Sequence, residues 1–463
     1  MAYGKTIAAI STPSGKGGVA IIRISGQDSL DIAKKIFIPH SKKSTPEFMP
    51  RVQVYGDIVS GDERIDDGMI TYFKAPNSYT GEDVVEISCH GGMLITRTVL
   101  ESALAAGATP AEAGEFTRRA FINGKLTLTE AEAIGTLLEA KSKEQIRLTS
   151  RVSRDRLSKR ISGIRVALTE ILSSVFARID YPDEDLGEFT NDECKDRLVV
   201  VRDMINALIS TYPTGKAITE GINTVICGKP NVGKSTLYNA IIGEDAAIVT
   251  DIEGTTRDLL TRQTPLGRVM LNLCDTAGVR EDDGIDAVEK IGIQRSKSAI
   301  SEADLIISLF DASSAAQDKD ISLVELVKAY SCPKIAILNK TDLGQKFDTC
   351  VLDGIFDKVI IASAKKNELT CIKELKDTVE KLFTDERLTV GEEAVISSAR
   401  HNAALCRAKT FVDAAIEAYE LGVYADAAAS EIERALGAIS EIDGRTVTEE
   451  VVSDIFSKFC VGK

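Results

Sequence analysis

The sequence predicts a protein of the α/β plus α class, in which a helical domain is interrupted by an α/β domain. Between residues 218 and 385, short apolar runs alternate with helical stretches, which is typical of a mostly parallel sheet covered on both faces. The flanking segments 121–217 and 386–463 show helical spacing of apolar residues. We therefore expect residues 218–385 to be inserted into a helical domain whose two halves lie apart in sequence. Residues 1–120 mix β-like runs with helical patches and are expected to form a smaller α/β domain.

The expected elements follow from these runs. In the first 120 residues the clearest strands are Ala20–Ile24 and Val84–Ser88. Helical periodicity is strongest for a set of four apolar residues, Ile161, Ile164, Leu168 and Ile171. The segment Pro213–Gly215 is expected to interrupt the helical pattern. The predicted strands of the inserted domain are Thr224–Cys227, Met270–Cys274, Leu305–Phe310, Ile335–Leu338 and Val359–Ala362.

The composition limits the class of protein. Of the 463 residues, 44% are hydrophobic and 27% charged, as in folded globular proteins. No apolar run reaches the roughly 18 residues that a membrane span requires, and no signal-peptide core begins the chain. The nine cysteines are scattered without a Cys-x-x-Cys pair, so neither a disulfide framework nor a zinc site is suggested. The expected compartment is the reducing cytoplasm, with no membrane partner.

The net charge of −14 argues against binding nucleic acid through the overall field of the protein. One basic stretch departs from this balance. Between Lys141 and Arg165 it contains nine Lys and Arg residues, interrupted only by Glu144 and Asp155 among charged residues. A solvated helix face is the simpler interpretation of this stretch, and contact with RNA or with a partner protein is the alternative.

Residues 228–235, Gly-Lys-Pro-Asn-Val-Gly-Lys-Ser, match the phosphate-loop pattern G-x-x-x-x-G-K-[ST]. They follow a predicted strand and precede the helical run Thr236–Ile242, which is the context the pattern requires. The glycines let backbone N–H groups converge on phosphates at a helix N-terminus. Lys234 can contact the β and γ phosphates, and the Ser235 hydroxyl can bind Mg²⁺.

Three further motifs follow in the order found in Ras-like GTPases. They are Asp275–Gly278, Asn339–Asp342 and Ser363–Lys365. Asp342 can accept hydrogen bonds from both N1–H and the 2-amino group of guanine, a pair that adenine does not offer, so the bound nucleotide is predicted to be GTP. Beyond Lys234 and Ser235, the predicted nucleotide-binding residues are Asn231, Val232, Gly233, Thr236, Thr250, Asp251, Ile252, Glu253, Gly254, Thr255, Thr256, Asp275, Thr276, Ala277, Gly278, Asn339, Lys340, Thr341, Asp342, Ser363, Ala364 and Lys365.

The expected hydrolytic machinery lacks one component. Ras-like enzymes orient the attacking water with a glutamine directly after the Asp-x-x-Gly motif. This chain has Val279 there, and valine can neither donate nor accept a hydrogen bond. An arginine finger is not evident either. Another group must therefore supply positive charge and orient the water.

Several motifs together resemble the MnmE (TrmE) family of tRNA-modification GTPases. In the central and terminal parts they are Gly254–Asp258, Asp275–Glu281, Glu289–Ile293 and Cys460–Lys463; in the amino-terminal part they are Gly17–Gly26, Ser78–Asp83, His90–Gly92 and Gly114–Lys125. The resemblance covers essentially the whole chain. It implies a tetrahydrofolate-binding and dimerisation domain at 1–120, a helical domain at 121–217 and 386–463, and a GTPase domain at 218–385.

The resemblance also implies an activity. The family hydrolyses GTP and works with an FAD-dependent partner (MnmG, or GidA) in a heterotetramer. Together they install an aminomethyl-type (carboxymethylaminomethyl) group at C5 of the wobble uridine of certain tRNAs. A 5-formyl- or methylene-tetrahydrofolate supplies the one-carbon unit, and the enzyme is a homodimer whose GTPase domains meet across their nucleotides.

Ion and water sites are implied for particular residues of this sequence. Asn231, the backbone carbonyls of Thr250 and Ile252, and Thr255 match a K⁺ site. The ion would stand where an arginine finger otherwise places its charge. Thr256 would join Ser235 on Mg²⁺. Glu289 would position the water, although a solvated helix-face glutamate is the alternative.

For the folate, the matching positions are Arg23, Glu82, Lys125 and the terminal Lys463. A carboxylate suits the amide and amine edge of the pteridine, and cations suit its carbonyl and the glutamate tail. Cys460 is a candidate for a direct chemical role, with packing or lining of the folate site as the alternative.

A terminal amphipathic helix is expected to carry the tail 460–463. Thr446 and Glu449 are predicted to form a capping box. The helix is expected to dock in the helical domain and to direct the tail toward the folate site. Its predicted apolar side consists of Val451, Val452, Ile455, Phe456 and Phe459.

A second class of function also fits the central domain. A regulatory switch GTPase of ribosome assembly would use the same nucleotide motifs without tRNA chemistry. It would leave the amino-terminal motifs and the cysteine-containing tail unexplained.

Overall fold

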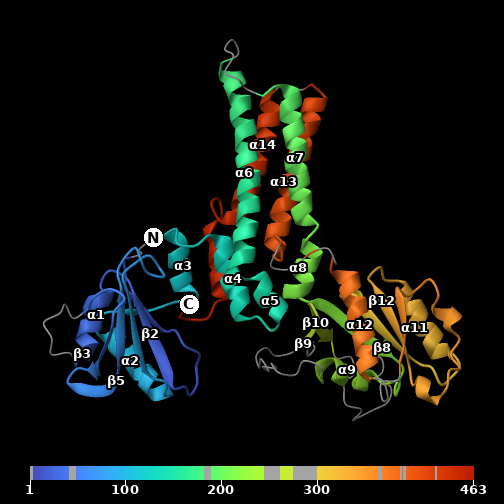
Figure 1. Ribbon diagram of the computed structural model, residues 1–463, viewed down its shortest axis with the longest axis horizontal. Helices are drawn as coiled ribbons and strands as arrows, with labels where there is room; N and C mark the ends of the chain where they lie inside the picture. The colour runs from blue at the N-terminus through green and yellow to red at the C-terminus, as the bar shows by residue number, and fades with distance from the viewer. Residues whose placement is uncertain are drawn as a thin grey trace. The chain divides into compact units, whose positions relative to one another are not determined.

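The computed structural model describes residues 4–40, 48–181, 189–243, 261–274, 300–362, 368–385, 388, 393–422 and 425–462. The chain divides into two compact units (Figure 1). Unit 1 contains residues 1–135 and 440–463, and unit 2 contains residues 136–439. No helix among the described ranges combines the length and apolar character that a membrane span needs.

Unit 1 is built on a seven-stranded sheet of order β3-β4-β5-β6-β2-β1-β7. All its strand pairs are antiparallel except β1 with β7, which is parallel. The expected strands Ala20–Ile24 and Val84–Ser88 lie within β2 and β6. The strands are β1 (Ile7–Ile10), β2 (Val19–Ser25), β3 (Phe37–Pro39), β4 (Gln53–Ser60), β5 (Glu63–Phe73), β6 (Val84–His90) and β7 (Thr109–Pro110).

Helices cover both faces of this sheet near β1. On one face, α1 (Ser29–Ile36) and α2 (Met93–Ala105) bury apolar side chains against Ile22, Ile24 and Ile87. On the other, Phe116 of α3 (Glu115–Ile122) packs with Ile7 and Ala9, which point away from Ala8 because side chains alternate along a strand. This second face carries the candidate residues described below.

Unit 2 contains the long helices α6 (Arg151–Asp180), α7 (Asn191–Ile209), α13 (Ala399–Glu420) and α14 (Ala425–Asp443). They run side by side in Figure 1. The predicted period on α6 is confirmed, because Ile161, Ile164, Leu168 and Ile171 are all buried. The shorter helix α5 (Lys143–Leu148) precedes α6, and α4 (Leu128–Leu138) before it lies mostly in unit 1.

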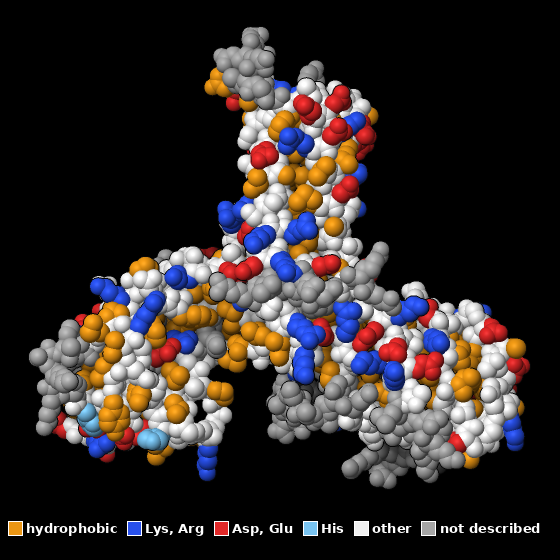
Figure 2. All heavy atoms as spheres, in the orientation of Figure 1, with side chains coloured by type: hydrophobic (Ala, Val, Ile, Leu, Met, Phe, Trp, Pro, Cys, Tyr) orange, Lys and Arg blue, Asp and Glu red, His pale blue; other side chains and the backbone are white. Residues whose placement is uncertain are grey.

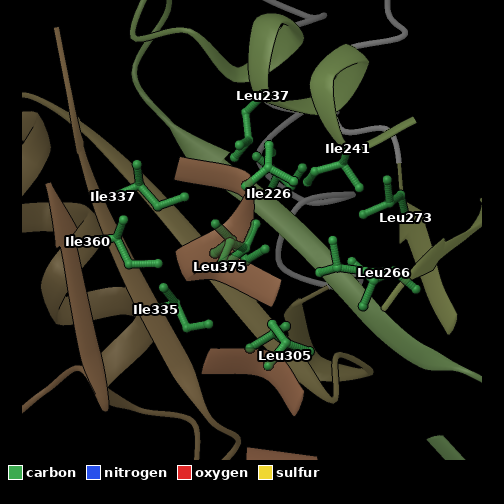
Figure 3. Packing of buried hydrophobic residues seen from close by; sticks show 14 of the residues in the cluster. Ile226, Leu237, Ile241, Leu266, Leu273, Leu305, Ile335, Ile337, Ile360 and Leu375 are labelled. Atoms are coloured by element: carbon green, nitrogen blue, oxygen red, sulfur yellow. The ribbon is translucent and has the colours of Figure 1, made fainter. Parts of the chain in front are cut away.

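The inserted domain of unit 2 has a six-stranded sheet of order β13-β12-β11-β8-β10-β9, parallel except for β9. Its apolar core includes Leu237 and Ile241 of α9 and Leu375 of α12, which meet the sheet residues Ile226 and Ile337 on one face (Figure 3). Helix α11 covers the other face. All five predicted strands are present. The elements are β8 (Ile222–Gly228), α9 (Lys234–Gly243), β9 (Thr261–Leu266), β10 (Val269–Cys274), β11 (Leu305–Asp311), α11 (Asp318–Lys328), β12 (Lys334–Asn339), η1 (Thr341–Leu343), η2 (Thr349–Leu352), β13 (Lys358–Ile361) and α12 (Glu368–Phe383).

The chain enters and leaves this sheet domain at one place. The hydroxyl of Thr211 accepts a hydrogen bond from the Ile396 N–H at 3.0 Å, and the hydroxyl of Thr214 accepts one from the Asp385 N–H at 3.0 Å. The residues before and after the insertion are therefore held together, as the predicted fold class requires. The helical pattern is interrupted at Ser210 and Thr211, just before the expected segment Pro213–Gly215. Pro213 itself lies in the first turn of the next helix, α8 (Tyr212–Thr219), where the missing N–H of proline costs no intrahelical hydrogen bond.

The terminal helix α15 (Glu449–Ser457) corrects one expectation and confirms another. It begins after Thr448 and has no side-chain capping hydrogen bond at that position, so the predicted capping box at Thr446 and Glu449 is wrong. Its apolar side docks in the helical domain, as expected. Val452 and Phe456 pack on Leu128 and Ala131 of α4 (Leu128–Leu138), although the apolar pattern alone fixes which side is buried and not which helix receives it.

Candidate functional site

The predicted phosphate loop joins the buried strand β8 to the N-terminus of α9. Asn231 and Gly233 adopt positive φ values of 63° and 105°. A Cβ at Gly233 would overlap the side-chain nitrogen of Asn339, so only glycine fits this turn. The loop thus directs the unpaired N–H groups of the first turn of α9 toward one point, which is an anion-binding arrangement.

The Lys234 ammonium lies inside the loop. It donates to the carbonyl oxygens of Gly228 at 2.9 Å and Lys229 at 2.8 Å. Burial lowers the pKa of Lys234, and bound phosphate would favour the charged form again. Ser235 and Thr236 are exposed beside it at the start of α9. These residues fit a Mg²⁺–nucleotide complex: a cation, a hydroxyl and a helix N-terminus face one point.

The end of β12 forms the base side of the site. The buried Asn339 donates its side-chain N–H to the Val232 carbonyl at 2.7 Å, which ties this strand to the phosphate loop. Lys340 has φ 63° and pairs with Asp311 at 2.7 Å. Burial acts to raise the pKa of Asp311, but hydrogen bonds from Lys340 and Ser313 outweigh it, so the pKa is lowered. Asp342 is exposed in η1 next to Thr341.

A second contact between the phosphate loop and the rest of the sheet domain was not predicted from the sequence. Lys229 forms an ion pair with the almost fully buried Asp320 of α11 and donates to Gln317 at 2.9 Å. In the sequence, Lys229 occupies one of the unspecified positions of the loop pattern. Only the packing of α11 shows that it has a buried partner.

Many predicted nucleotide residues lie outside the described part of the chain. These are Thr250, Asp251, Ile252, Glu253, Gly254, Thr255, Thr256, Asp275, Thr276, Ala277, Gly278, Glu289, Ser363, Ala364 and Lys365. The terminal Lys463 also lies outside it.

In unit 1, Arg23 lies on β2 directly across from Glu86 of β6. The two side chains form an ion pair at 2.9 Å. The Arg23 guanidinium also lies over the rings of Tyr79 and Phe116, with centroid distances of 5.3 and 5.6 Å. A neighbouring carboxylate and two ring faces therefore hold this cation at the sheet surface.

The predicted folate residue Glu82 contacts Ser25, which lies two positions along β2 from Arg23. Ser25 of β2 donates to Glu82 Oε2 at 2.7 Å. Arg119 of α3 donates through Nη1 to both carboxylate oxygens, at 3.0 and 3.2 Å. Lys125 donates to the Pro76 carbonyl at 3.0 Å, on the loop that leads to Glu82. The sequence motif around residue 119 contains two adjacent arginines, and only burial distinguishes Arg119, whose side chain is 3% exposed.

The carboxyl-terminal tail reaches the same region. The Gly462 carbonyl accepts hydrogen bonds from Ser11 Oγ at 3.0 Å and from Arg23 Nη1 at 3.5 Å. Val461 forms an antiparallel bridge with Ala113. Cys460 is exposed and is a free thiol. The structure thus brings the tail to Arg23. Both belong to unit 1, which combines residues 1–135 with residues 440–463.

The basic stretch between Lys141 and Arg165 is partly engaged within the protein. Lys141 donates to Gln263 at 2.8 Å, and Arg147 pairs with Glu144 at 2.6 Å. On the face seen in Figure 2, basic side chains along the long helices alternate with acidic and hydrophobic ones. This mixture agrees with a solvated surface.

Two family profiles match this chain. One, described as the N-terminus of the GTP-binding protein TrmE, matches residues 6–125. The other, described as the MnmE helical domain, matches residues 128–460.

Full-length relatives are similar throughout. The chain is 39% identical to a protein named tRNA modification GTPase MnmE from Clostridioides difficile (strain 630), over 99% of each chain. It is 37% identical to the protein of that name from Thermoanaerobacter pseudethanolicus, over 99% of each chain. It is 38% identical to the one from Lactococcus lactis subsp. lactis, over 99% of this chain and 98% of that relative.

Proposed function

The chain belongs to the MnmE family of tRNA modification GTPases, and we propose that it is a K⁺-activated GTPase that also binds a one-carbon tetrahydrofolate. As a member of this family, the protein hydrolyses GTP to GDP and phosphate in tRNA modification. The observation that carries the folate proposal is the contact of the tail with Arg23 and Ser11, because a simple switch GTPase does not account for this charged site in unit 1.

In the nucleotide site, Lys234 would leave its two carbonyl partners and contact the β and γ phosphates. Ser235 and Thr256 would hold Mg²⁺, whose charge neutralises the phosphates. Asp342 would select guanine, with Asn339 and Lys340 fixing the strand end that carries it. The other residues predicted from the motifs, such as Asp275, Gly278 and Ser363, would also contact the nucleotide.

The K⁺ site would be formed by Asn231 with Thr250, Ile252 and Thr255. The positive φ of Asn231 and the exposure of its side chain support this assignment, because an exposed amide in the phosphate loop is available to a cation. The ion would supply positive charge in the transition state. Glu289 would position the attacking water.

In unit 1, Glu82 would accept hydrogen bonds from the pteridine, and Arg23, Lys125 and Lys463 would bind its carbonyl and glutamate oxygens. The fit is chemical: two cations and a carboxylate lie around one loop, and their charges complement those of a reduced folate. Cys460 would line this site or react in it.

We further propose that the protein is a cytoplasmic homodimer and that it acts on tRNA together with an FAD-dependent MnmG/GidA-type partner. The complex would be a heterotetramer that adds a carboxymethylaminomethyl-type group at C5 of the wobble uridine. The division at residues 120, 217 and 385 into folate, helical and GTPase domains belongs to the same proposal.

Mass spectrometry of tRNA nucleosides from cells lacking this protein tests the proposed chemistry. We expect the C5-substituted wobble uridine to disappear and to return when the wild-type chain is restored. Unchanged nucleosides would instead favour the regulatory switch of ribosome assembly.

The ion proposal is tested by GTP turnover in K⁺ and in Na⁺ at equal ionic strength. We expect substantially faster turnover in K⁺, since Val279 cannot orient water or supply charge. Equal rates in both salts would remove the K⁺ site from the mechanism while leaving the tRNA proposal intact.

A further inference from the structure

Arg119 is a buried cation next to the proposed folate site, and no motif role has been assigned to it. Its side chain is 3% exposed, whereas that of Glu82 is 19% exposed. A ligand at the surface of unit 1 can therefore reach Glu82 much more easily than Arg119. Any effect of Arg119 on a bound ligand has to pass through the residues that its guanidinium contacts.

Two acceptors other than Glu82 hold the Arg119 guanidinium in place. Glu115 Oε1 accepts from Arg119 Nη2 at 2.8 Å and from Nε at 3.3 Å. The Lys5 carbonyl also accepts from Nη2, at 3.1 Å. Glu115 is itself anchored, because its Oε2 accepts from the Glu112 N–H at 2.8 Å. The planar guanidinium thus has a defined orientation before it meets Glu82.

The remaining guanidinium nitrogen is directed at Glu82. Nη1 donates to both Glu82 oxygens, and Ser25 Oγ donates to Oε2. Two carboxylate oxygens have about four acceptor sites, so these three hydrogen bonds leave capacity for a ligand N–H. Glu82 lies on a loop before β6 rather than in a strand, and a carboxylate on a loop would otherwise lose rotamer freedom when a ligand binds.

The charges agree with this role. One arginine faces two carboxylates, Glu82 and Glu115, so the cluster keeps a net negative charge. The two carboxylates are exposed to a similar extent, 15% for Glu115 and 19% for Glu82. Glu115 is engaged by Arg119 and by the Glu112 N–H, whereas Glu82 keeps acceptor capacity for a ligand.

We propose that Arg119 is a positioning residue of the folate site, which holds the Glu82 carboxylate in the orientation that accepts the N–H groups of the pteridine. This inference rests on the proposed folate binding. Arg119 does not touch the ligand, and its effect depends on Glu82.

Calorimetric titration of the full-length protein with 5-formyltetrahydrofolate tests this role. In Arg119→Lys the charge is kept, but the planar guanidinium that contacts Glu82 through Nη1, and Glu115 and the Lys5 carbonyl through Nη2, is lost. We expect its Kd to rise about tenfold or more, the order of effect expected when a charge-assisted hydrogen bond is lost. Arg118→Lys, at the adjacent half-buried position of α3, is the matched control and should bind like the wild type.

A double-mutant cycle separates positioning from a structural role. In a Glu82→Gln background, Arg119→Lys should change the Kd by less than about twofold, because the carboxylate it orients is gone. Equal fold-changes in both backgrounds would overturn the proposal, and so would wild-type affinity in the single variant.

Ser25→Ala tests the same claim if Arg119→Lys does not fold, as judged by circular dichroism and thermal unfolding. It removes the other side-chain donor to Glu82, so we expect a several-fold higher Kd that vanishes in the Glu82→Gln background. An unchanged Kd in Ser25→Ala, when Arg119→Lys is unfolded, would assign the cluster to stability alone. Failure of the wild-type chain to bind 5-formyltetrahydrofolate would be a different result, since it would refute folate binding itself.

Discussion

The two candidate sites of this protein are assembled in different ways. In the phosphate loop, Lys234 contacts the carbonyls of residues five and six positions earlier. In unit 1, Arg119 contacts a residue 37 positions away and another 114 away, and Arg23 contacts one 439 away. The phosphate loop itself is essentially one turn of the chain, although Asn339 and Asp320 tie it to later segments, whereas the second site exists only when distant segments are packed together.

This difference indicates how each site should fail. A local site depends on a few side chains and on backbone geometry, so its loss need not affect the rest of the protein. A site made from distant segments depends on the packing that brings them together. Substitutions remote from the ligand should therefore weaken it.

Lys234→Ala should have the largest effect and should separate the two sites most clearly. Removing a cation that stabilises developing phosphate charge costs about 10²–10³-fold in rate. We expect GTP turnover to fall by that order while the Kd for 5-formyltetrahydrofolate is unchanged. Lys328→Ala, an exposed lysine on α11, is the control and should keep full turnover. A parallel loss of folate binding would contradict the independence of the two sites.

Asp342→Asn should come next. Two hydrogen bonds to the charged carboxylate are altered, each contributing about 1.5–3 kcal/mol, so the affinity for GTP should fall about 10²-fold or more. Affinity for xanthosine triphosphate should rise, because its base presents an acceptor where guanine has an amine. The thermal unfolding midpoint should hardly move, since Asp342 is exposed. Competition titrations measure both affinities, and unchanged GTP affinity would disprove the assigned base contact.

Gly462→Ala tests whether the carboxyl-terminal tail contributes to the proposed folate site of unit 1. Gly462 has φ 98°, and a Cβ there would overlap the Ile10 carbonyl. A left-handed conformation costs other residues about 1–2 kcal/mol, so folate affinity should fall about tenfold. Val461→Ala changes an exposed tail residue, 58% accessible, and should bind like the wild type. Equal affinities in both variants would mean that the tail takes no part in the site.

The smallest expected effect is a titration shift at His90. The hydrogen bond and charge of Asp66, whose Oδ1 lies 2.8 Å from His90 Nδ1, raise the pKa of His90 above its ordinary 6.5. A raised pKa means that the contact stabilises the fold below about pH 6.5 and is lost as the pH rises through the folded value. NMR titration should show a lower His90 pKa in Asp66→Asn, with GTP turnover unchanged. The same pKa in both proteins would exclude this ion pair in solution.

The sequence predicted the phosphate-loop context and the order of elements around it because these depend on neighbouring residues. Gly228, Gly233 and Lys234 act within one strand–loop–helix, and the strand pattern of 218–385 follows from alternating apolar runs. The fold class is confirmed for the same reason. Local sequence reasoning was wrong at a helix boundary, the start of α15.

The tertiary structure decided which surfaces and partners these elements meet. The apolar pattern of α15 required burial but did not show that Leu128 and Ala131 receive it. The motif that contains Arg118 and Arg119 did not distinguish the buried cation from its neighbour. Burial and pairing depend on segments that are distant in sequence, and a side chain carries no local signal of the partner that folding will bring to it.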